Sequence, residues 1–459
     1  MSTTDAASRL DPLRSRLNGQ ALAPGEDGWD AARQAWNLLA DQRPAGVVFA
    51  QGADDVVATV EFASREGLRV APQGTGHSAT ALESLSDTLL LKTMRMSAVQ
   101  IDAGARRARV EAGALWGDLA VAAGEHGLAG LSGSSPDVGV VGYSLGGGVG
   151  WLGRPYGLAS NSIVAAEVVT AAGELVRADH DNEAELFWAL RGGGGSFGVV
   201  TALELELFPV AELYAGSIMW PVEQAAEVMH AYREWARTVP DELTSGVRLL
   251  NLPPIPEVPE PLRGRSVVDV TGAFLGGEAE GAALLEPLRG VGQPFIDGFA
   301  SIPPAGLSRI YGDPEQPTPG MTHSAPLLSE LTPEAVDALV ELGGPGSGTP
   351  LLMLALRHLG GALGSAPAGA GALDSLDGEF VLYGVGVPMA PEQAGAIAEH
   401  LDRMVEAVSP WASGPDYLNL SERPVSMSSS FREDVLERLR DVKASVNPND
   451  MFVASHPVA

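Results

Sequence analysis

Three glycine-rich segments constrain the fold of this chain more than any other feature of its sequence. They span residues 72–78, 138–150 and 191–198, and apolar residues such as Tyr143 and Val149 are interleaved with the glycines. Because flexible linkers are polar, glycines set among apolar side chains predict an ordered backbone. Glycine lets a ligand approach the main chain closely, and successive N–H groups can hold a pyrophosphate. We therefore expect a ligand groove lined by backbone.

The first 210 residues predict mixed strands and helices around these segments. A short helix at 30–37 precedes a β-α-β unit, in which Asp54 and Asp55 are placed to cap the helix. The unit comprises a strand at 46–50, a helix at 56–65 and a strand at 68–71. Further strands are expected at 88–91, 109–112, 163–170 and 198–208, and one further helix is expected at 114–126. This order is typical of an α+β fold.

The composition shifts after Pro209, and a second region of strands and helices follows. Its clearest strands are expected at 266–270, 351–359 and 380–383, and its clearest helices at 333–342 and 391–405. In the tail, residues 431–446 carry apolar side chains at helical spacing, and Asn447-Pro448 ends that helix. We expect this final helix to dock on the rest of the protein.

Charge and composition exclude several classes of protein. The chain has 29 basic and 58 acidic side chains, and its formal charge of −29 repels phosphate backbones and anionic membranes, so neither is an expected partner. The absence of cysteine excludes disulfides, thiolate metal sites and iron–sulfur clusters, so redox chemistry requires a cofactor. Because neither a secretory signal nor a transmembrane run is present, we expect a cytoplasmic protein. We expect it to be a monomer or a homodimer.

Three common kinds of site are disfavoured. The pattern G-x-G-x-x-G occurs at 148–153 and 193–198, but neither match opens a helix as a dinucleotide fingerprint does. The pattern G-x-S-x-G surrounds Ser144 and Ser196, but neither match fits the strand-to-helix turn of a nucleophile elbow. The eight histidines are scattered without metal-ligand spacing, so no metal site is expected.

The order of the motifs resembles the berberine-bridge-enzyme-like group of FAD-linked oxidases, and the bacterial 6-hydroxynicotine oxidase branch is similar. The likeness covers nearly the whole chain, and the joint order of the motifs carries it. The motifs are Pro24-Gly25-x-x-x-Trp29-Asp30-x-Ala32-Arg33 with Trp36-Asn37, Gly74-x-Gly76-His77-Ser78, Gly146-Gly-Gly-x-Gly150, Tyr156-Gly157-Leu158-Ala159, a stretch from Leu186 to Gly195, and a tail from Leu439 to Phe452.

The resemblance implies an α+β fold with a PCMH-type FAD-binding domain and a substrate domain whose antiparallel sheet is backed by helices. It divides the chain into an N-terminal segment at 1–39, the FAD-binding domain at 40–211, the substrate domain at 212–415, and a tail at 416–459 that returns to the FAD-binding domain.

The resemblance also implies FAD attached by one covalent link, from His77 to the 8α-methyl group of the flavin. Thr75 replaces a glycine of the family motif, and Gln73 stands where many members have arginine. Ser135 stands where doubly tethered members have cysteine, and its hydroxyl cannot form their thioether. The residues expected to contact the cofactor are Gly74, Thr75, Gly76, His77, Ser78, Ser135, Val138, Gly139, Gly142, Gly146, Gly147, Gly148, Val200 and Asn419.

Tyr417 and Tyr143 are the candidate catalytic residues. Tyr417 begins the remnant of a Tyr-x-Asn-Tyr motif, whose second tyrosine is Leu420 here, and Val149 replaces another tyrosine of the family. An unassisted phenol with a pKa near 10 is a poor base, so Tyr417 either orients the substrate or needs help from its surroundings. Arg357 and His358 are candidate substrate contacts, and because neighbouring strand residues face opposite sides, at most one of them should face the flavin.

The expected function is oxidation of a small organic substrate, an alcohol, an amine or a secondary-metabolite intermediate. Hydride passes to flavin N5, and dioxygen reoxidises the flavin to give hydrogen peroxide. In the family, a valine at the position of Val138 goes with an open oxygen pocket. Two alternatives remain, a dehydrogenase with another electron acceptor and a flavin-binding or ligand-binding protein without turnover.

Overall fold

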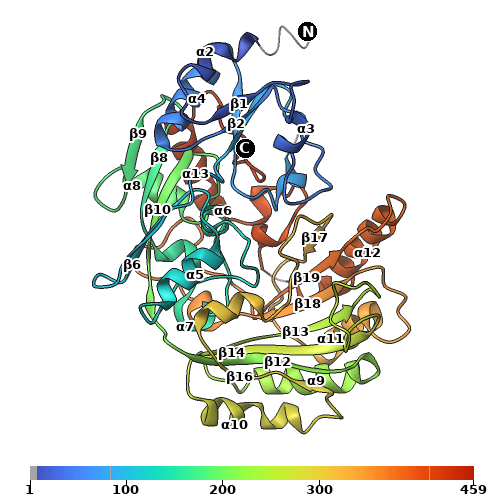
Figure 1. Cartoon of the computed structure of the whole chain (residues 1–459). Coiled ribbons are helices and arrows are strands. Elements are labelled where there is room, and N and C mark those ends of the chain that lie inside the picture. The colour runs from blue at the N-terminus through green and yellow to red at the C-terminus, as the bar shows by residue number, and fades with distance from the viewer. Residues whose placement is uncertain (1–7, 83, 413) are drawn as a thin grey trace.

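The computed structural model of the chain describes residues 8–82, 84–412 and 414–459, so residues 1–7 of the expected N-terminal segment lie outside the described residues. Its first part is built on two sheets, of which β1, β2, β6, β8, β9 and β10 are labelled in the upper half of Figure 1. The first has the order β1(Gln20–Leu22), β2(Gly46–Phe49), β4(Thr88–Lys92) and β3(Arg69–Gln73). The second has the order β5(Val99–Asp102), β6(Arg107–Glu111), β10(Val199–Glu206), β8(Ile163–Val169) and β9(Leu175–Ala178).

The predicted β-α-β unit is confirmed as β2, helix α4(Ala53–Glu66) and β3, but the two strands are not neighbours. Strand β4 lies between them and pairs parallel to both. The predicted cap is wrong, because no side chain caps α4 and Gly52 occupies the cap position. Instead, the Asp55 carboxylate accepts hydrogen bonds from the backbone N–H groups of Asn18, Gly19 and Gln51. It therefore ties the N-terminal segment to the first sheet.

The helix predicted at 30–37 is too long. Helix α3 spans only Trp29–Ala32, and the chain beyond it is irregular, with turns and a single bridge at Asn37. The backbone N–H of Trp36 donates to the Thr75 carbonyl, and that of Asn37 donates to the Gly76 carbonyl. Pairing with the first glycine-rich segment replaces helical hydrogen bonds, and helical spacing alone cannot reveal such a tertiary contact.

The second sheet is antiparallel and is flanked by the helices α5(Trp116–Gly124), α6(Val140–Leu145) and α8(Ala184–Leu190), whereas α7(Gly153–Tyr156) packs on β13(Leu243–Asn251) of the second part. The strand predicted at 198–208 forms β10 and then β11(Phe208–Pro209), which pairs with β7(Leu128–Ala129). Two buried clusters form the core of this part, one around Trp116 and Leu203 and one around Val48 and Phe62.

The second part is a large sheet with helices on one face, as expected from the sequence. Its strand order is β15(Ile296–Asp297), β12(Leu213–Pro221), β14(Ser266–Phe274), β13(Leu243–Asn251), β18(Met353–His358), β19(Phe380–Gly386) and β17(Met321–Ser324), with β16(Ala300–Ile302) beside β12. Helices α9(Ala225–Ala236), α10(Glu278–Arg289), α11(Pro333–Gly343) and α12(Gln393–Val408) accompany it. In Figure 1, α9 and α10 lie on the side of the sheet away from the first part.

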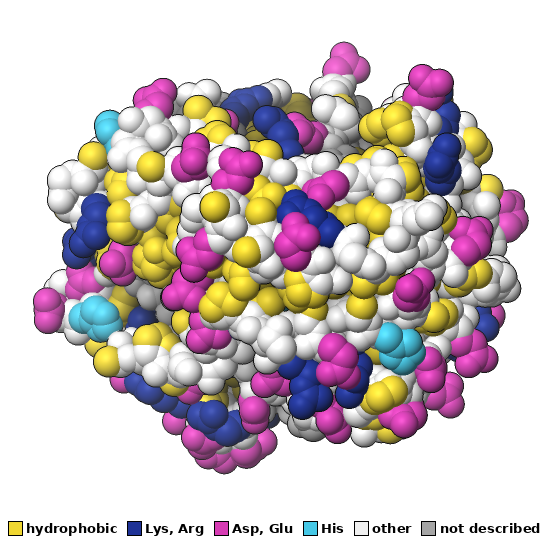
Figure 2. Space-filling model, turned by 90° about the horizontal axis from the view of Figure 1, so that it is seen from below, with side chains coloured by type: hydrophobic (Ala, Val, Ile, Leu, Met, Phe, Trp, Pro, Cys, Tyr) yellow, Lys and Arg dark blue, Asp and Glu magenta, His cyan; other side chains and the backbone are white. Residues whose placement is uncertain are grey.

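The two faces of the large sheet carry different side chains. Val247, Val268 and Leu356 belong to the core packed against the helices. The opposite face presents Met353 and Tyr383, together with the charged residues Arg248, Asp269 and Arg357. Viewed from below, the outer surface of this part carries interspersed acidic and basic groups without an extended region of one charge (Figure 2). Because the helices cover the apolar face, the face with the charged residues is the inner one, toward the first part.

The tail returns to the first part of the molecule. Helix α13(Glu433–Val446) packs on α8, and the chain beyond it pairs with β3, where the Val70 N–H donates to the Met451 carbonyl. The Asn447 side chain donates to the Ser196 carbonyl and accepts from the Met451 N–H. The predicted final helix is confirmed, and the segment before it carries Tyr417 and Asn419 to the second glycine-rich segment.

Candidate active site

His77 lies at the end of the glycine turn that follows β3. Its Nδ1 is 2.7 Å from the Thr75 hydroxyl oxygen, and its ring stacks on that of Trp36 with 4.1 Å between the ring centroids. Gly76 has a φ of 91°, and a Cβ there would lie 2.8 Å from the Cβ of Ala35. Only glycine therefore lets the turn pack this closely on the segment that carries Trp36.

Asp137 connects the first two glycine-rich segments. Its carboxylate accepts hydrogen bonds from the Trp36 indole N–H and from the Ser135 hydroxyl, the latter at 2.7 Å, and its Oδ1 lies 3.9 Å from Nε2 of His77. Burial lowers the pKa of His77 to about 4, although the charge of Asp137 opposes this shift. The imidazole is therefore neutral at pH 7, and one ring nitrogen keeps a lone pair.

Side chains pack tightly around the three glycines at 146–148. A Cβ on Gly146 would collide with the Asn419 amide, and a Cβ on Gly148 would collide with the Tyr143 ring. Gly147 and Gly148 also have φ values of 117° and 81°. Glycine is required here by the protein's own packing, so cofactor contact at these positions stays a prediction.

Tyr417 is bound to this segment through its hydroxyl. The oxygen accepts hydrogen bonds from the N–H groups of Gly148 and Val149, both at 2.9 Å, and from the Asn419 amide at 3.3 Å. Asn419 also donates to the Tyr143 carbonyl at 2.8 Å. Burial raises the pKa of Tyr417 to about 12, although these N–H groups oppose the shift. Tyr417 is therefore a protonated phenol at neutral pH and holds the glycine segment in place.

Tyr143 projects from α6 toward the same region. Its ring meets Trp116 edge-on with 5.4 Å between the ring centroids, and a Cβ on Gly133 would lie 3.1 Å from it. Its buried hydroxyl has no hydrogen-bond partner among the described residues. Burial raises the pKa of Tyr143 well above its usual value, so this residue is also a phenol at neutral pH.

Arg357 reaches the site from the large sheet. Its guanidinium donates to the Ser134 hydroxyl at 3.0 Å and to the Val149 carbonyl at 3.4 Å. Its Cζ lies 5.0 Å from the ring centroid of Tyr311 and 5.3 Å from that of Tyr383. Arg357 therefore joins the sheet to the loop before the second glycine-rich segment and to the end of that segment.

His358 faces the opposite side of β18, as strand alternation requires. Its Nε2 lies 3.1 Å from the Arg154 guanidinium, and its ring stacks on that of Phe380 with 5.1 Å between the centroids. Burial and the charge of Arg154 lower the pKa of His358 to about 3. The structure brings Arg357 to Tyr143 and Tyr417 but does not bring His358 there, and His358 instead helps to hold α7 on the sheet.

The other predicted residues are spread along the glycine-rich segments. Val138 is half-buried beside Asp137, and Val200 is buried in β10. The Ser78 carbonyl accepts a hydrogen bond from the Ser455 hydroxyl in the tail. Ser144 lies inside α6 and Ser196 is buried in a loop, so neither occupies a nucleophile elbow. The described residues contain no cluster of acidic and histidine side chains suited to a metal ion.

Sequence reasoning missed several residues of this site. Tyr311 and Tyr383 come from a loop and from β19, and Asp137 and Ser134 lie on either side of Ser135, at the position where doubly tethered members have cysteine. Tyrosine offered a usable signal, because the chain has only seven, and four of them, Tyr143, Tyr311, Tyr383 and Tyr417, lie around Arg357.

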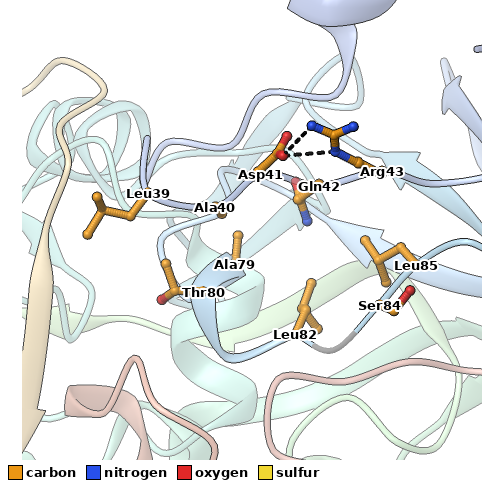
Figure 3. A pocket seen from close by; sticks show the side chains of 10 residues that line it. All are labelled: Leu39, Ala40, Asp41, Gln42, Arg43, Ala79, Thr80, Leu82, Ser84 and Leu85. Atoms are coloured by element: carbon orange, nitrogen blue, oxygen red, sulfur yellow. Dashed lines mark hydrogen bonds and ion pairs between the residues drawn. The ribbon is translucent and has the colours of Figure 1, made fainter. Parts of the chain in front are cut away.

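A cavity of about 420 Å³ lies beside the residues that follow the glycine turn (Figure 3). The apolar side chains of Leu39, Leu82 and Leu85 surround it, and Asp41 pairs with Arg43 at its edge. None of the predicted site residues lines it. This cavity is therefore separate from the site formed by Tyr417 and Arg357.

Comparison with known proteins places this site in a family. Residues 44–179 match the model of the FAD binding domain. The chain is 37% identical over 205 residues to (R)-6-hydroxynicotine oxidase of Paenarthrobacter nicotinovorans, a match that spans 44% of this chain and 45% of that protein. The crystal structure of 6-hydroxy-D-nicotine oxidase from Arthrobacter nicotinovorans superimposes with a TM-score of 0.80 at 25% identity, over 96% of this chain and 97% of that one.

The likeness extends to berberine bridge enzyme from Eschscholzia californica, whose structure matches with a TM-score of 0.82 at 20% identity, over 99% of both chains. The chain is a berberine-bridge-enzyme-like (BBE-like) FAD-linked oxidoreductase. The predicted family and α+β fold are thereby confirmed. The described residues of this BBE-like oxidoreductase form no helix long and apolar enough to cross a bilayer.

The glycine-rich segments of this BBE-like oxidoreductase fit FAD. A Cβ on Gly142 would meet no atom within 4 Å. On Gly74 and Gly139 it would make only contacts of 3.5 Å or more, with the Ala112 carbonyl and with Thr75. These three glycines, unlike those at 146–148, leave backbone open to a ligand. The residues present would therefore suit a dinucleotide held between the start of α6, at Gly139 and Gly142, and the glycine turn at Gly74.

Proposed function

We propose that the protein is an FAD-dependent oxidase whose flavin is attached once, through His77. The observation that carries the proposal is the position of this neutral imidazole, at the end of the open glycine turn and between Trp36 and Asp137. A neutral ring nitrogen can form a covalent bond, whereas an imidazolium cannot. The Ser135 hydroxyl donates a hydrogen bond to Asp137. Because a hydroxyl cannot form a thioether, Ser135 supports a single attachment.

The bound flavin would accept a hydride from a carbon of the substrate and pass the electrons to dioxygen, giving hydrogen peroxide. The protein would supply positioning and electrostatics around this chemistry. Tyr417 and Asn419 would hold the glycine segment beside the reacting atoms, and Tyr143 and Arg357 would face the substrate. The substrate hydroxyl or amine proton would leave to a nearby acceptor, for which a phenol with a pKa of about 12 is poorly suited at pH 7.

Dioxygen is proposed as the acceptor because Val138, rather than a bulkier residue, stands beside Asp137. The test is anaerobic mixing of the flavin-loaded enzyme with small alcohols and amines, followed by air. We expect bleaching of the flavin absorbance, then rapid recovery with stoichiometric hydrogen peroxide. Slow recovery in air with rapid turnover on a quinone would make the protein a dehydrogenase. Photoreduction without bleaching by any substrate would favour a binding protein without turnover.

A further inference from the structure

Two arginines on the inner face of the large sheet have very different partners. Arg357 pairs in register with Gly246, and Arg248 lies two residues further along β13, so both side chains point to the same side. Arg248 is buried and binds the Asp269 carboxylate through Nε at 2.9 Å and through a second nitrogen. Arg357 donates only to neutral oxygens, those of Ser134 and Val149. Within the described residues, no carboxylate forms an ion pair with Arg357.

Three tyrosine hydroxyls near Arg357 also lack partners. Those of Tyr143, Tyr311 and Tyr383 are buried and make no hydrogen bond with any described residue. They come from α6, from the loop before β17 and from β19, and the Arg357 charge interacts with all three. A buried polar group without a partner destabilises a fold. Three such groups around one cation indicate a site whose acceptor is not part of the protein.

The nearest carboxylate does not supply this acceptor. The Asp313 oxygen Oδ2 accepts a hydrogen bond from the Ser134 hydroxyl at 3.0 Å, and Ser134 in turn accepts from Arg357. Asp313 therefore contacts the guanidinium only indirectly, through the Ser134 hydroxyl. Burial raises the pKa of Asp313, which weakens it further as a counter-charge. Arg357 is half-buried, so part of its side chain contacts solvent.

We propose that Arg357 and the hydroxyls of Tyr143, Tyr311 and Tyr383 bind a carboxylate of the substrate, so that the enzyme oxidises a small organic acid at a carbon away from that group. A carboxylate only accepts hydrogen bonds and has two oxygens with about four lone-pair sites, which matches one guanidinium and three phenols. A neutral amide or alcohol would leave the cation unpaired. This assignment deepens the proposed function and rests on it for the oxidation step.

The test is calorimetric titration with a panel of aliphatic and aromatic monocarboxylates, each compared with its primary amide, on holoenzyme whose flavin content is measured in the same sample. We expect the preferred carboxylate to bind at least 10-fold more tightly than its amide. Arg357→Met should weaken carboxylate binding by about 10- to 100-fold and leave amide binding within about threefold. Tyr383→Phe should weaken it by about 3- to 10-fold. Arg309→Met, an exposed arginine in the loop before Tyr311, should keep the wild-type preference.

Two results would overturn the inference: no carboxylate in the panel preferred over its amide, or a preference that survives Arg357→Met. Arg357→Lys guards against misfolding, because it keeps the charge without the planar fork and should give an intermediate affinity. The calorimetric result is independent of turnover. Holoenzyme that binds a carboxylate through Arg357, but whose flavin is bleached by no substrate, would contradict the proposed function while supporting the carboxylate site.

Discussion

The cofactor side of the candidate site and its sheet side are built from different kinds of sequence. Thr75, His77 and Ser78 lie in one turn, and the backbone of that turn forms the wall. On the sheet side, Arg357, Tyr311 and Tyr383 come from distant segments and act through their side chains. The comparison teaches that local glycine patterns identify the cofactor chemistry of this family, whereas the proposed substrate contacts are residues that only the folded sheet brings together.

The largest expected effect separates the two sides at His77. His77→Ala should abolish covalently retained flavin completely, because no other residue at this turn offers a ring nitrogen, while the Arg357-dependent carboxylate preference should persist. Acid-precipitated variant protein should be colourless, and precipitated wild type should be yellow. His126→Ala, an exposed histidine after α5, is the matched control and should stay yellow. A yellow His77→Ala pellet would mean that the cofactor side has been assigned incorrectly.

The second effect concerns the buried ion pair of the sheet side, Arg248 with Asp269. Asp269→Asn should lower the free energy of unfolding by about 3–5 kcal/mol, because it leaves the buried Arg248 charge without its partner. Asp297→Asn removes a surface ion pair with Arg289 and should change it by about 1 kcal/mol or less. Denaturant titration of both variants provides the comparison. Equal losses of unfolding free energy in the two variants would show that the buried Arg248–Asp269 pair stabilises the protein no more than the surface pair does.

A smaller effect is expected at Tyr417, where the two sides meet. Tyr417→Phe removes the acceptor for two buried backbone N–H groups and should destabilise the protein by about 1–3 kcal/mol. Because this phenol is protonated at neutral pH, anaerobic flavin reduction should slow by less than about 10-fold. Tyr156→Phe, on a ring that stacks on Phe208, controls for loss of a hydroxyl elsewhere. A loss of about 10²–10⁴-fold would instead identify Tyr417 as the base.

The smallest effect concerns Glu422, at the seam between the tail, β17 and the N-terminal segment. It accepts hydrogen bonds from the Thr322 N–H and the Asn37 amide, and burial raises its pKa to about 8 despite them. A raised carboxyl pKa adds stability that is full below pH 4.5 and is lost as the pH rises through 8. Glu422→Gln should therefore reduce the loss of unfolding free energy between pH 7 and pH 9 by about 1–2 kcal/mol. If the unfolding free energies of wild type and Glu422→Gln changed with pH in parallel, the raised pKa of Glu422 would be contradicted.

The sequence predicted most of what depends on local pattern. The β-α-β unit, the large antiparallel sheet and the terminal helix all follow from periodicity and from the resemblance, and Arg357 and His358 diverge as strand alternation requires. The predictions from the sequence were wrong where tertiary contacts determine the local structure. The segment at 33–37 has helical spacing but pairs with the glycine turn, and Asp55 binds the N-terminal segment instead of capping α4.

The sheet side could not be predicted for the same reason. Nothing in the sequence near Tyr311 or Tyr383 marks either as a site residue, because each gains its role from Arg357 across the fold. Asp137 was equally hidden, since its importance depends on the approach of His77 and Trp36 from another segment. The triple glycine was noticed for its composition, but its packing against Asn419 and Tyr143 appears only in the structure.

The most direct test of the central claim is a mass map of peptides from denatured wild-type holoenzyme. The account predicts that FAD remains bound after denaturation and that its mass lies on the peptide containing His77, with none on the peptide containing Ser135. Flavin that separates from the denatured chain, or that appears on any peptide without His77, would contradict the account.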